Sequence, residues 1–283
     1  MAVGIDVFSG NGTLDFATAK TRGRCSFVGL RAAYGTTPDS HYHQYLAECR
    51  ALGLATFGYL FLRFGEGVGS PEDQAQVLLD TMGDQNPSEL TPAIDLEFGG
   101  KRPDGVTAGE ALDWFLRCYQ TVKAGLGGAD PGVYTSEVVW IDPDGMNNLP
   151  CDEVAGAWSW MKYWPWPPST PAIYDLATVN GIAPPHVAPP FAGNWTMQQY
   201  MGDAPNYPGC PTKVDLNRTR VLAQGAKGGS VQWVQRKLGV TIDGTFGSQT
   251  DAAVRAFQHG HGLQVDGAVG LATASYLSRV PKT

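Results

Sequence analysis

The chain has 283 residues, of which 43% are hydrophobic and 11% aromatic, and a formal net charge of −7. This length suits one large domain and a small one, with enough apolar side chains for a real core. The charge disfavours nucleic acid as a partner, since phosphate neutralisation needs clustered Lys and Arg, and no run approaches the roughly 20 apolar residues of a membrane-inserted helix.

The chain starts with Met-Ala-Val-Gly, without the basic segment, apolar run and cleavage site of a signal peptide. We therefore expect synthesis in a cytoplasm without export by the standard route. Five scattered cysteines form no CxxC pair, which favours free thiols, although one or two disulfides stay open. The pairs His41/His43 and His259/His261 have i, i+2 spacing instead of the i, i+4 of a helical zinc site. No metal or cofactor is expected.

Residues 1–221 alternate short apolar runs with amphipathic segments. Strands are predicted at 3–8, 27–33, 55–61, 93–96, 132–135, 154–160 and 196–200, with a last strand around 214–217. Helices are predicted at 41–52, 71–82 and 108–125. Strands that alternate with helices predict a parallel sheet, and this number of units predicts an α/β fold of the irregular, TIM-like barrel type. The proline-rich segment 164–190 is predicted to be a long surface loop beside the cleft.

One predicted strand carries two carboxylates within the sequence Thr-Pro-Ala-Ile-Asp-Leu-Glu-Phe of residues 91–98. Side chains alternate along a strand, so Asp95 and Glu97 point to the same face, with Cα atoms about 6.5–7 Å apart. Buried charge is costly unless it is paired or used. For an isolated pair, a structural ion-pair site is the simpler interpretation. Two carboxylates that converge on one site are also what glycoside hydrolysis requires.

Two further carboxylates change this balance. Asp6 lies in the first strand and Asp215 in the last, each inside an apolar run. In a barrel, functional side chains collect at the carboxyl ends of the strands, and Asp6, Asp95 and Glu97 fall at or near such ends. Acids that meet in one pocket repel each other and raise some pKa values, which keeps a carboxyl protonated near neutral pH. The four acids together predict a glycosidase.

The composition changes near residue 222. Residues 222–229 include Gln-Gly-Ala-Lys-Gly-Gly and are predicted to form a short flexible linker. The pattern DGxxGxxT then occurs at 243–250 and again at 266–273. Each copy reads as a glycine turn followed by a helix start. Helices at 230–238, 249–259 and 271–277 predict a small all-α three-helix module over residues 230–283.

The motifs Gly4-Ile5-Asp6-Val7, Ala93-Ile94-Asp95-Leu96-Glu97 and Val214-Asp215-Leu216-Asn217 resemble, in order and spacing, the family 25 glycoside hydrolases or Chalaropsis-type lysozymes. This resemblance covers about residues 3–220. It implies an irregular β/α barrel that cleaves β-1,4 bonds of bacterial peptidoglycan glycan strands as an N-acetylmuramidase. The repeat resembles the peptidoglycan-binding type 1 domain, which implies wall binding.

Within this interpretation Glu97 is expected to donate the proton to the glycosidic oxygen and then to activate water. Asp95 either attacks the sugar directly or, as we prefer, orients the substrate acetamide in a retaining, substrate-assisted route. Asp6 and Asp215 are expected to stabilise positive charge. The residues expected to bind substrate are Tyr59, Tyr134, Trp158 and Gln199.

We expect a monomeric enzyme of the phage endolysin type that is made in a host cytoplasm and acts at the bacterial cell wall. The alternatives are a catalytically degenerate wall-binding protein, a bacterial autolysin or another wall glycosidase. The sugar at the new reducing end would distinguish the hydrolases, and a binder would release none.

Overall fold

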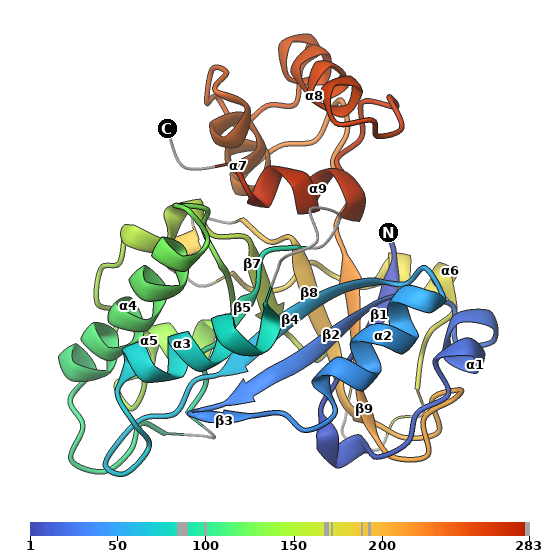
Figure 1. Cartoon of the computed structure of the whole chain (residues 1–283). Helices are drawn as coiled ribbons and strands as arrows, with labels where there is room; N and C mark the ends of the chain where they lie inside the picture. Colours follow the sequence, from blue (N-terminus) through green and yellow to red (C-terminus); the bar gives the residue numbers. More distant parts are fainter. Residues whose placement is uncertain are drawn as a thin grey trace.

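The computed structural model describes residues 1–83, 90–98, 101–166, 170, 172–187, 189–191 and 194–280. Its main body is a closed barrel of eight strands with helices around it, and a small helical module sits on one end (Figure 1). The strands are β1 (Val3–Val7), β2 (Cys25–Tyr34), β3 (Thr37–Pro38), β4 (Ala55–Phe61), β5 (Ala93–Asp95), β6 (Gly132–Thr135), β7 (Ser159–Lys162), β8 (Met197–Ala204) and β9 (Val214–Thr219). The barrel helices are α1 (Phe16–Thr21), α2 (Tyr42–Ala51), α3 (Pro71–Met82), α4 (Ala108–Gly125), α5 (Glu137–Ile141) and α6 (Leu176–Gly181).

The barrel confirms the predicted α/β class, and its last strand makes it irregular. The strand order is β1-β9-β8-β7-β6-β5-β4-β2, closed by parallel pairing of β1 with β2, and the short β3 pairs with β2 outside the ring. β9 runs antiparallel to both β1 and β8. Its beginning therefore lies at the end of the barrel where the parallel strands finish, and Asp215 stands directly opposite Asp6 in the pairing.

Helix caps account for the agreement between predicted and observed helices. α3 and α4 have the predicted bounds. Ser70 accepts a hydrogen bond from the Asp73 backbone N–H at 3.0 Å, and the Asp73 carboxylate accepts one from the Ser70 backbone N–H at 3.1 Å. Thr107 and Glu110 make the same reciprocal pair at the start of α4. Such capping boxes satisfy backbone donors that a helix start would otherwise leave unpaired.

The predicted strand at 154–160 is wrong in its first half. Residues Glu153–Gly156 form a 3₁₀ turn, η2, closed by the Ala157 N–H to the Val154 carbonyl at 2.9 Å, and β7 begins only at Ser159. The predicted proline-rich loop lies partly outside the described residues, and its described part contains α6. The fully buried Arg218 of β9 holds this part to the barrel by donating to the Val179 and Ala183 carbonyls, each at 2.8 Å.

The module consists of the three predicted helices, α7 (Gly229–Leu238), α8 (Ser248–Gly260) and α9 (Leu271–Ser278). Its sequence repeat is a repeated hydrogen-bond arrangement around two buried glutamines. Gln235 donates to the Asp243 carboxylate at 2.7 Å and the Thr250 hydroxyl at 3.1 Å, and accepts from the Gly244 N–H at 2.9 Å.

Gln258 makes the same contacts to Asp266, Thr273 and Gly267, at 2.8, 3.1 and 2.9 Å. Both glycines have a positive φ, of 69° and 72°, a backbone conformation that glycine adopts at little cost. The Asp, the first Gly and the Thr of each DGxxGxxT copy are thus partners of one buried glutamine, and the second Gly is the N-cap residue of α8 or α9.

The module packs against the end of the barrel at which the parallel strands begin. Trp233 of α7 is 1% exposed, donates to the Gly156 carbonyl at 3.1 Å, and belongs to one buried apolar cluster with Phe27, Phe57 and Trp158 of the barrel. A buried ion pair joins Lys237 to Asp130 at 3.1 Å. The Ser230 hydroxyl joins the domains near their connection. It accepts from the Trp195 backbone N–H and donates to the Trp195 carbonyl, and Arg220 donates to the same hydroxyl at 2.8 Å.

The segment predicted as a flexible linker is engaged by the module. Leu222 is buried and forms a bridge with Val269, and Lys227 forms one with Thr245. The two domains therefore share a core and are not simply tethered. The module lies at one end of the barrel (Figure 1), and the cavity lined by Asp6, Asp95 and Asp215 lies at the other.

Candidate active site

The four predicted acids meet at the barrel mouth. Asp6, Asp95, Glu97 and Asp215 line one cavity of about 210 Å³. They arrive from β1, from the end of β5 and from the beginning of β9, and the antiparallel direction of β9 is what brings Asp215 to this end. Leu96, between the two central acids, is fully buried and continues the strand pairing through its N–H to the Tyr134 carbonyl at 2.9 Å. The two carboxylates therefore share one face, as strand alternation predicts.

Asp6 and Asp215 are joined by a single amide. Gln199 Nε2 donates to Asp6 Oδ2 at 3.2 Å and to Asp215 Oδ2 at 3.1 Å. Asn217 Nδ2 adds a 2.6 Å bond to Asp6, and the Asn217 amide oxygen accepts from Trp160 at 2.7 Å. Gln199 Oε1 accepts from the Tyr134 hydroxyl at 2.7 Å. Every polar atom of the Gln199 amide is thus used inside the protein.

The central acids differ from each other in exposure. Asp95 is 6% exposed, and its Oδ1 has no hydrogen-bond partner among the described residues. The Glu97 side chain is 27% exposed, and its Oε2 lies 3.5 Å from Lys162 Nζ. A buried acceptor without a partner is costly. Asp95 is therefore a buried acid with one oxygen that the described residues leave unsatisfied, while Glu97 is the carboxyl open to the cleft.

Burial and mutual repulsion shift three of these carboxyls in the same direction. Burial, and then the charge of Asp215, raise the pKa of Asp6 well above its ordinary value. Burial, and then the charge of Glu97, do the same to the pKa of Asp95. Burial raises the pKa of Asp215 to about 6. Such raised values are characteristic of sites that use carboxyls for proton transfer and charge stabilisation.

Glu97 lies where this cavity joins a larger one. The second cavity, of about 600 Å³, is lined by Glu97, Lys162 and Trp164 and by residues around α5. Trp164 is 40% exposed, and the Lys162 ammonium lies 4.4 Å from the centre of its ring. Arg31 connects the acid cavity to a third cavity, of about 470 Å³, on the other side. The acids therefore lie in the middle of a groove, as expected of an enzyme that cuts within a chain.

The structure separates the predicted substrate-binding residues into two groups. Tyr59, Tyr134 and Gln199 line the acid cavity. Trp158 does not, and its prediction as a substrate-binding residue is wrong. It is fully buried against the module, and its indole N–H bonds Thr91 at the opposite end of the barrel. Trp160 lines the cavity instead, edge-on to Tyr134 at 4.6 Å between ring centres.

The described part of the chain offers neither a metal site nor a membrane-spanning helix. No group of three or more His, Cys, Asp or Glu side chains there has the arrangement of a metal site. None of the helices described is both long and apolar enough to cross a membrane.

A closed β/α barrel with paired carboxylates in the middle of an aromatic-lined groove is the arrangement of a glycoside hydrolase. The sequence agrees with this class. Residues 5–202 match the glycosyl hydrolases family 25, and residues 227–277 match the peptidoglycan binding domain family PG_binding_1. The first match spans more than half of the chain, and the protein belongs to the glycosyl hydrolases family 25.

Solved structures show the same fold. A bacterial lysozyme from Streptomyces coelicolor is 21% identical with a TM-score of 0.61, over 77% of this chain and 92% of that one. A muramidase from Trichobolus zukalii is 20% identical with a TM-score of 0.58, over 78% and 94%. The CTP1L endolysin is 17% identical with a TM-score of 0.54, over 78% and 67%. In a search of curated proteins, none matches the chain. The two domains together indicate peptidoglycan as the substrate and the bacterial wall as the place of action.

Proposed function

We propose that the protein is an N-acetylmuramidase that cleaves the β-1,4 bond between N-acetylmuramic acid and N-acetylglucosamine. The observation that carries this proposal is the position of Glu97, a partly exposed carboxyl at the junction of two cavities and beside the buried Asp95. A cut in the middle of a groove suits a polymeric glycan. Two observations support this bond specificity: the wall-binding module, and the fold that the barrel shares with a lysozyme and a muramidase.

The test uses the full chain and purified peptidoglycan. After digestion, the new reducing ends are reduced with borohydride and the labelled sugar is identified. The proposal requires reduced muramic acid. Reduced glucosamine would make the protein a glucosaminidase, and the absence of any new reducing end would make it a wall-binding protein.

We further propose that Glu97 is the general acid and base and that Asp95 orients the substrate acetamide. An orienting carboxylate must accept the acetamide N–H while the acetamide oxygen attacks the anomeric carbon. The position of Asp95 supports this assignment, because Asp95 lines the acid cavity beside Glu97 and its Oδ1 bonds none of the described residues. Direct attack by a carboxylate would need a separation of about 5–5.5 Å between the carboxyls and would give a covalent glycosyl-enzyme.

Both routes retain configuration, so the anomer of the first product tests retention and a search for a covalent adduct separates the two routes. NMR of the first product should show the β anomer, and the α anomer would contradict retention. Mass spectrometry of acid-quenched enzyme should show no glycosyl adduct at steady state. An adduct on Asp95 would replace the orienting role with a nucleophilic one.

Asp6 and Asp215 are proposed to stabilise positive charge on the sugar ring through the electrostatic field of the cavity. Gln199 is proposed to position these two acids and not to bind substrate, since its amide is fully bonded and 2% exposed. Tyr59 and Tyr134, on neighbouring strands, line the cavity and are proposed to contact the sugar.

We propose a phage endolysin as the biological role. The combination of a muramidase barrel and a wall-binding module, and the fold shared with the CTP1L endolysin, support it. Expression in the cytoplasm of a sensitive bacterium should lyse cells only after a separate agent permeabilises the membrane. Lysis without that agent would indicate an autolysin with its own route to the wall.

A further inference from the structure

A row of alternating aromatic and cationic side chains leads away from the acids, beginning at Phe8 and Arg31, which line the acid cavity. This cationic row consists of Phe8, Arg31, Tyr34 and Arg63. The Arg31 guanidinium carbon lies 4.3 Å from the centre of the Phe8 ring and 5.4 Å from that of Tyr34. The Arg63 guanidinium carbon lies 4.9 Å from the Tyr34 ring on the same row. Both aromatic residues are 39% exposed, so the row is part of the surface.

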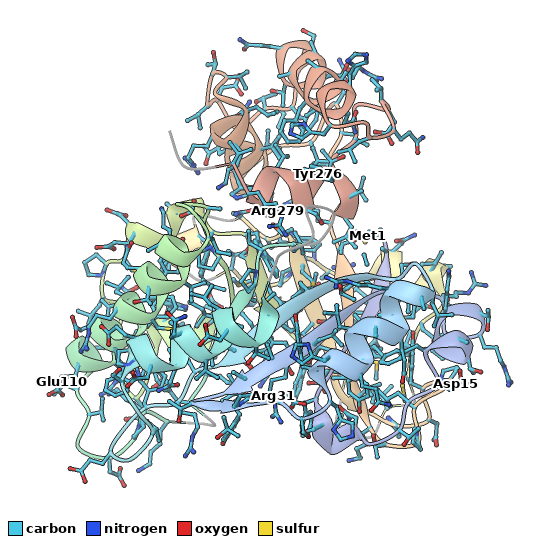
Figure 2. All side chains as sticks on the ribbon, in the orientation of Figure 1. Met1, Asp15, Arg31, Glu110, Tyr276 and Arg279 are labelled. Atoms are coloured by element: carbon cyan, nitrogen blue, oxygen red, sulfur yellow. The ribbon has the colours of Figure 1, made fainter. Side chains whose placement is uncertain are left out.

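Arg31 is fixed by a buried carboxylate. Asp39 is 7% exposed and accepts from Arg31 Nε at 3.0 Å and Nη2 at 2.9 Å. Asp39 also accepts from the backbone N–H groups of Ser9 and His41, at 3.1 and 3.0 Å. Among the described residues, Arg31 Nη1 has no hydrogen-bond acceptor, and this edge of the guanidinium is left for a ligand. Arg31 lines both the acid cavity and the third cavity, at the end of the barrel remote from the module (Figure 2).

The backbone of Arg63 is also held in place by a buried side chain. Its backbone N–H and carbonyl are both bonded, at 2.9 Å, by the side chain of the fully buried Gln74. Gly35, with φ of 58°, turns the chain next to it, and a Cβ at that position would lie 3.2 Å from Arg63 Cδ. The guanidinium itself pairs with no carboxylate among the described residues. Within the described residues, Arg63 is therefore an exposed cation without a carboxylate partner, on a chain of net charge −7.

An exposed arginine beside the catalytic cavity suits an anionic group on the substrate, close to the bond that is cut. Because Arg31 lines both the catalytic cavity and the neighbouring one, a ligand of the row can belong to the same molecule as a sugar bound in the catalytic cavity. N-acetylmuramic acid carries a peptide on its lactyl ether, and that peptide has free carboxylates. An exposed arginine gives a charge-assisted bond to such a carboxylate.

We propose that the cationic row binds the stem peptide of the muramic acid residue next to the cleaved bond, with Arg63 pairing with a peptide carboxylate. This inference rests on the proposed muramidase function and adds a preference for peptide-bearing glycan. Wall polymers with phosphate groups offer similar charge, but they are not attached to the sugar at this position.

The experiment compares two substrates: uncross-linked glycan strands that carry their stem peptides, and the same strands after an amidase has removed them. The variant is Arg63→Glu. Its matched control is Arg22→Glu, an identical charge change at the exposed C-cap of α1, at a residue that belongs neither to the cationic row nor to the three cavities. Because Arg63 is exposed, the thermal midpoint should not change, and Arg63→Gln serves if the charge reversal impairs folding.

On peptide-bearing strands Arg63→Glu should lose about tenfold in kcat/KM, which corresponds to roughly 1.4 kcal/mol, and Arg63→Lys should lose less. On stripped strands Arg63→Glu should match the wild type, and Arg22→Glu should match it on both. An equal loss on both substrates, or no loss on either, would overturn the proposal. A loss that disappears when wall phosphate polymers are removed, with the peptides intact, would assign the row to those polymers instead. Failure of the wild type to cut either substrate would overturn the proposed function as well.

Discussion

The shared core of barrel and module gives a prediction about how the protein unfolds. Replacing Trp233 with alanine removes the side chain that links the two domains in one apolar cluster, and it leaves the Gly156 carbonyl without its 3.1 Å donor. If the domains are one cooperative unit, this change in the module destabilises the catalytic barrel.

The magnitude follows from the burial of Trp233, which is 1% exposed. Truncating a buried tryptophan costs about 3–5 kcal/mol, and the lost hydrogen bond adds about 1 kcal/mol. For a chain of this size each kcal/mol lowers the midpoint by roughly 2–4 °C, so a decrease on the order of 10 °C is expected. Calorimetry should show one transition for wild type and variant, and loss of wall-lysing activity on heating should follow it.

Ile242→Ala is the matched control, because this module residue is 47% exposed and away from the cluster. It should change the unfolding free energy by no more than about 0.5 kcal/mol. Two separate transitions in the wild type, with only the module's transition lowered in Trp233→Ala, would refute the shared core. Because the domains share this cluster, removing the module after residue 221 would expose the base of the barrel. Such a truncation is therefore a poor test of wall targeting.

Three further predictions concern the network of the site and the repeat of the module. Gln199→Leu should lower kcat about tenfold or more with little change in KM, since each bond to a charged group contributes about 1.5–3 kcal/mol; a change in KM alone would show that Gln199 binds substrate. Gln235→Ala and Gln258→Ala break equivalent networks and should each cost about 2–4 kcal/mol in urea unfolding, and a large difference between them would contradict the equivalence. Burial raises the pKa of Asp215 to about 6, above its unfolded value, so stability from this carboxyl is complete below about pH 4 and is lost as the pH rises through about 6. Relative to wild type, Asp215→Asn should therefore gain roughly 1–2 kcal/mol between about pH 5 and about pH 8, and a pH-independent difference would be inconsistent with this.

Local signals were sufficient for the barrel's long helices and for its acids. The caps at Ser70 and Thr107 place α3 and α4, because they supply partners that only a helix start needs. The acids could be predicted because carboxylates inside apolar strands are rare without a use. Strand alternation correctly placed Asp95 and Glu97 on one face.

Two features could not be predicted from the sequence: how far along the barrel axis a side chain lies, and which distant residues a polar group bonds. Trp158 and Trp160 share a face, but only Trp160 reaches the mouth, because β7 begins at Ser159 and Trp158 stays at the base. The role of Gln199 depends on long-range pairing of β8 with β9. The composition of residues 222–229 indicates flexibility, whereas the buried surface that holds this segment belongs to other elements.

The central claim is that Glu97 performs the proton transfers of glycan cleavage. Glu97→Gln keeps the shape of the side chain and removes its acid and base function. Release of muramic reducing ends from purified peptidoglycan should fall by about a hundredfold or more, while the thermal midpoint and binding to insoluble walls stay as in the wild type. A variant that folds, binds the wall and still releases these ends at close to the wild-type rate would contradict the account.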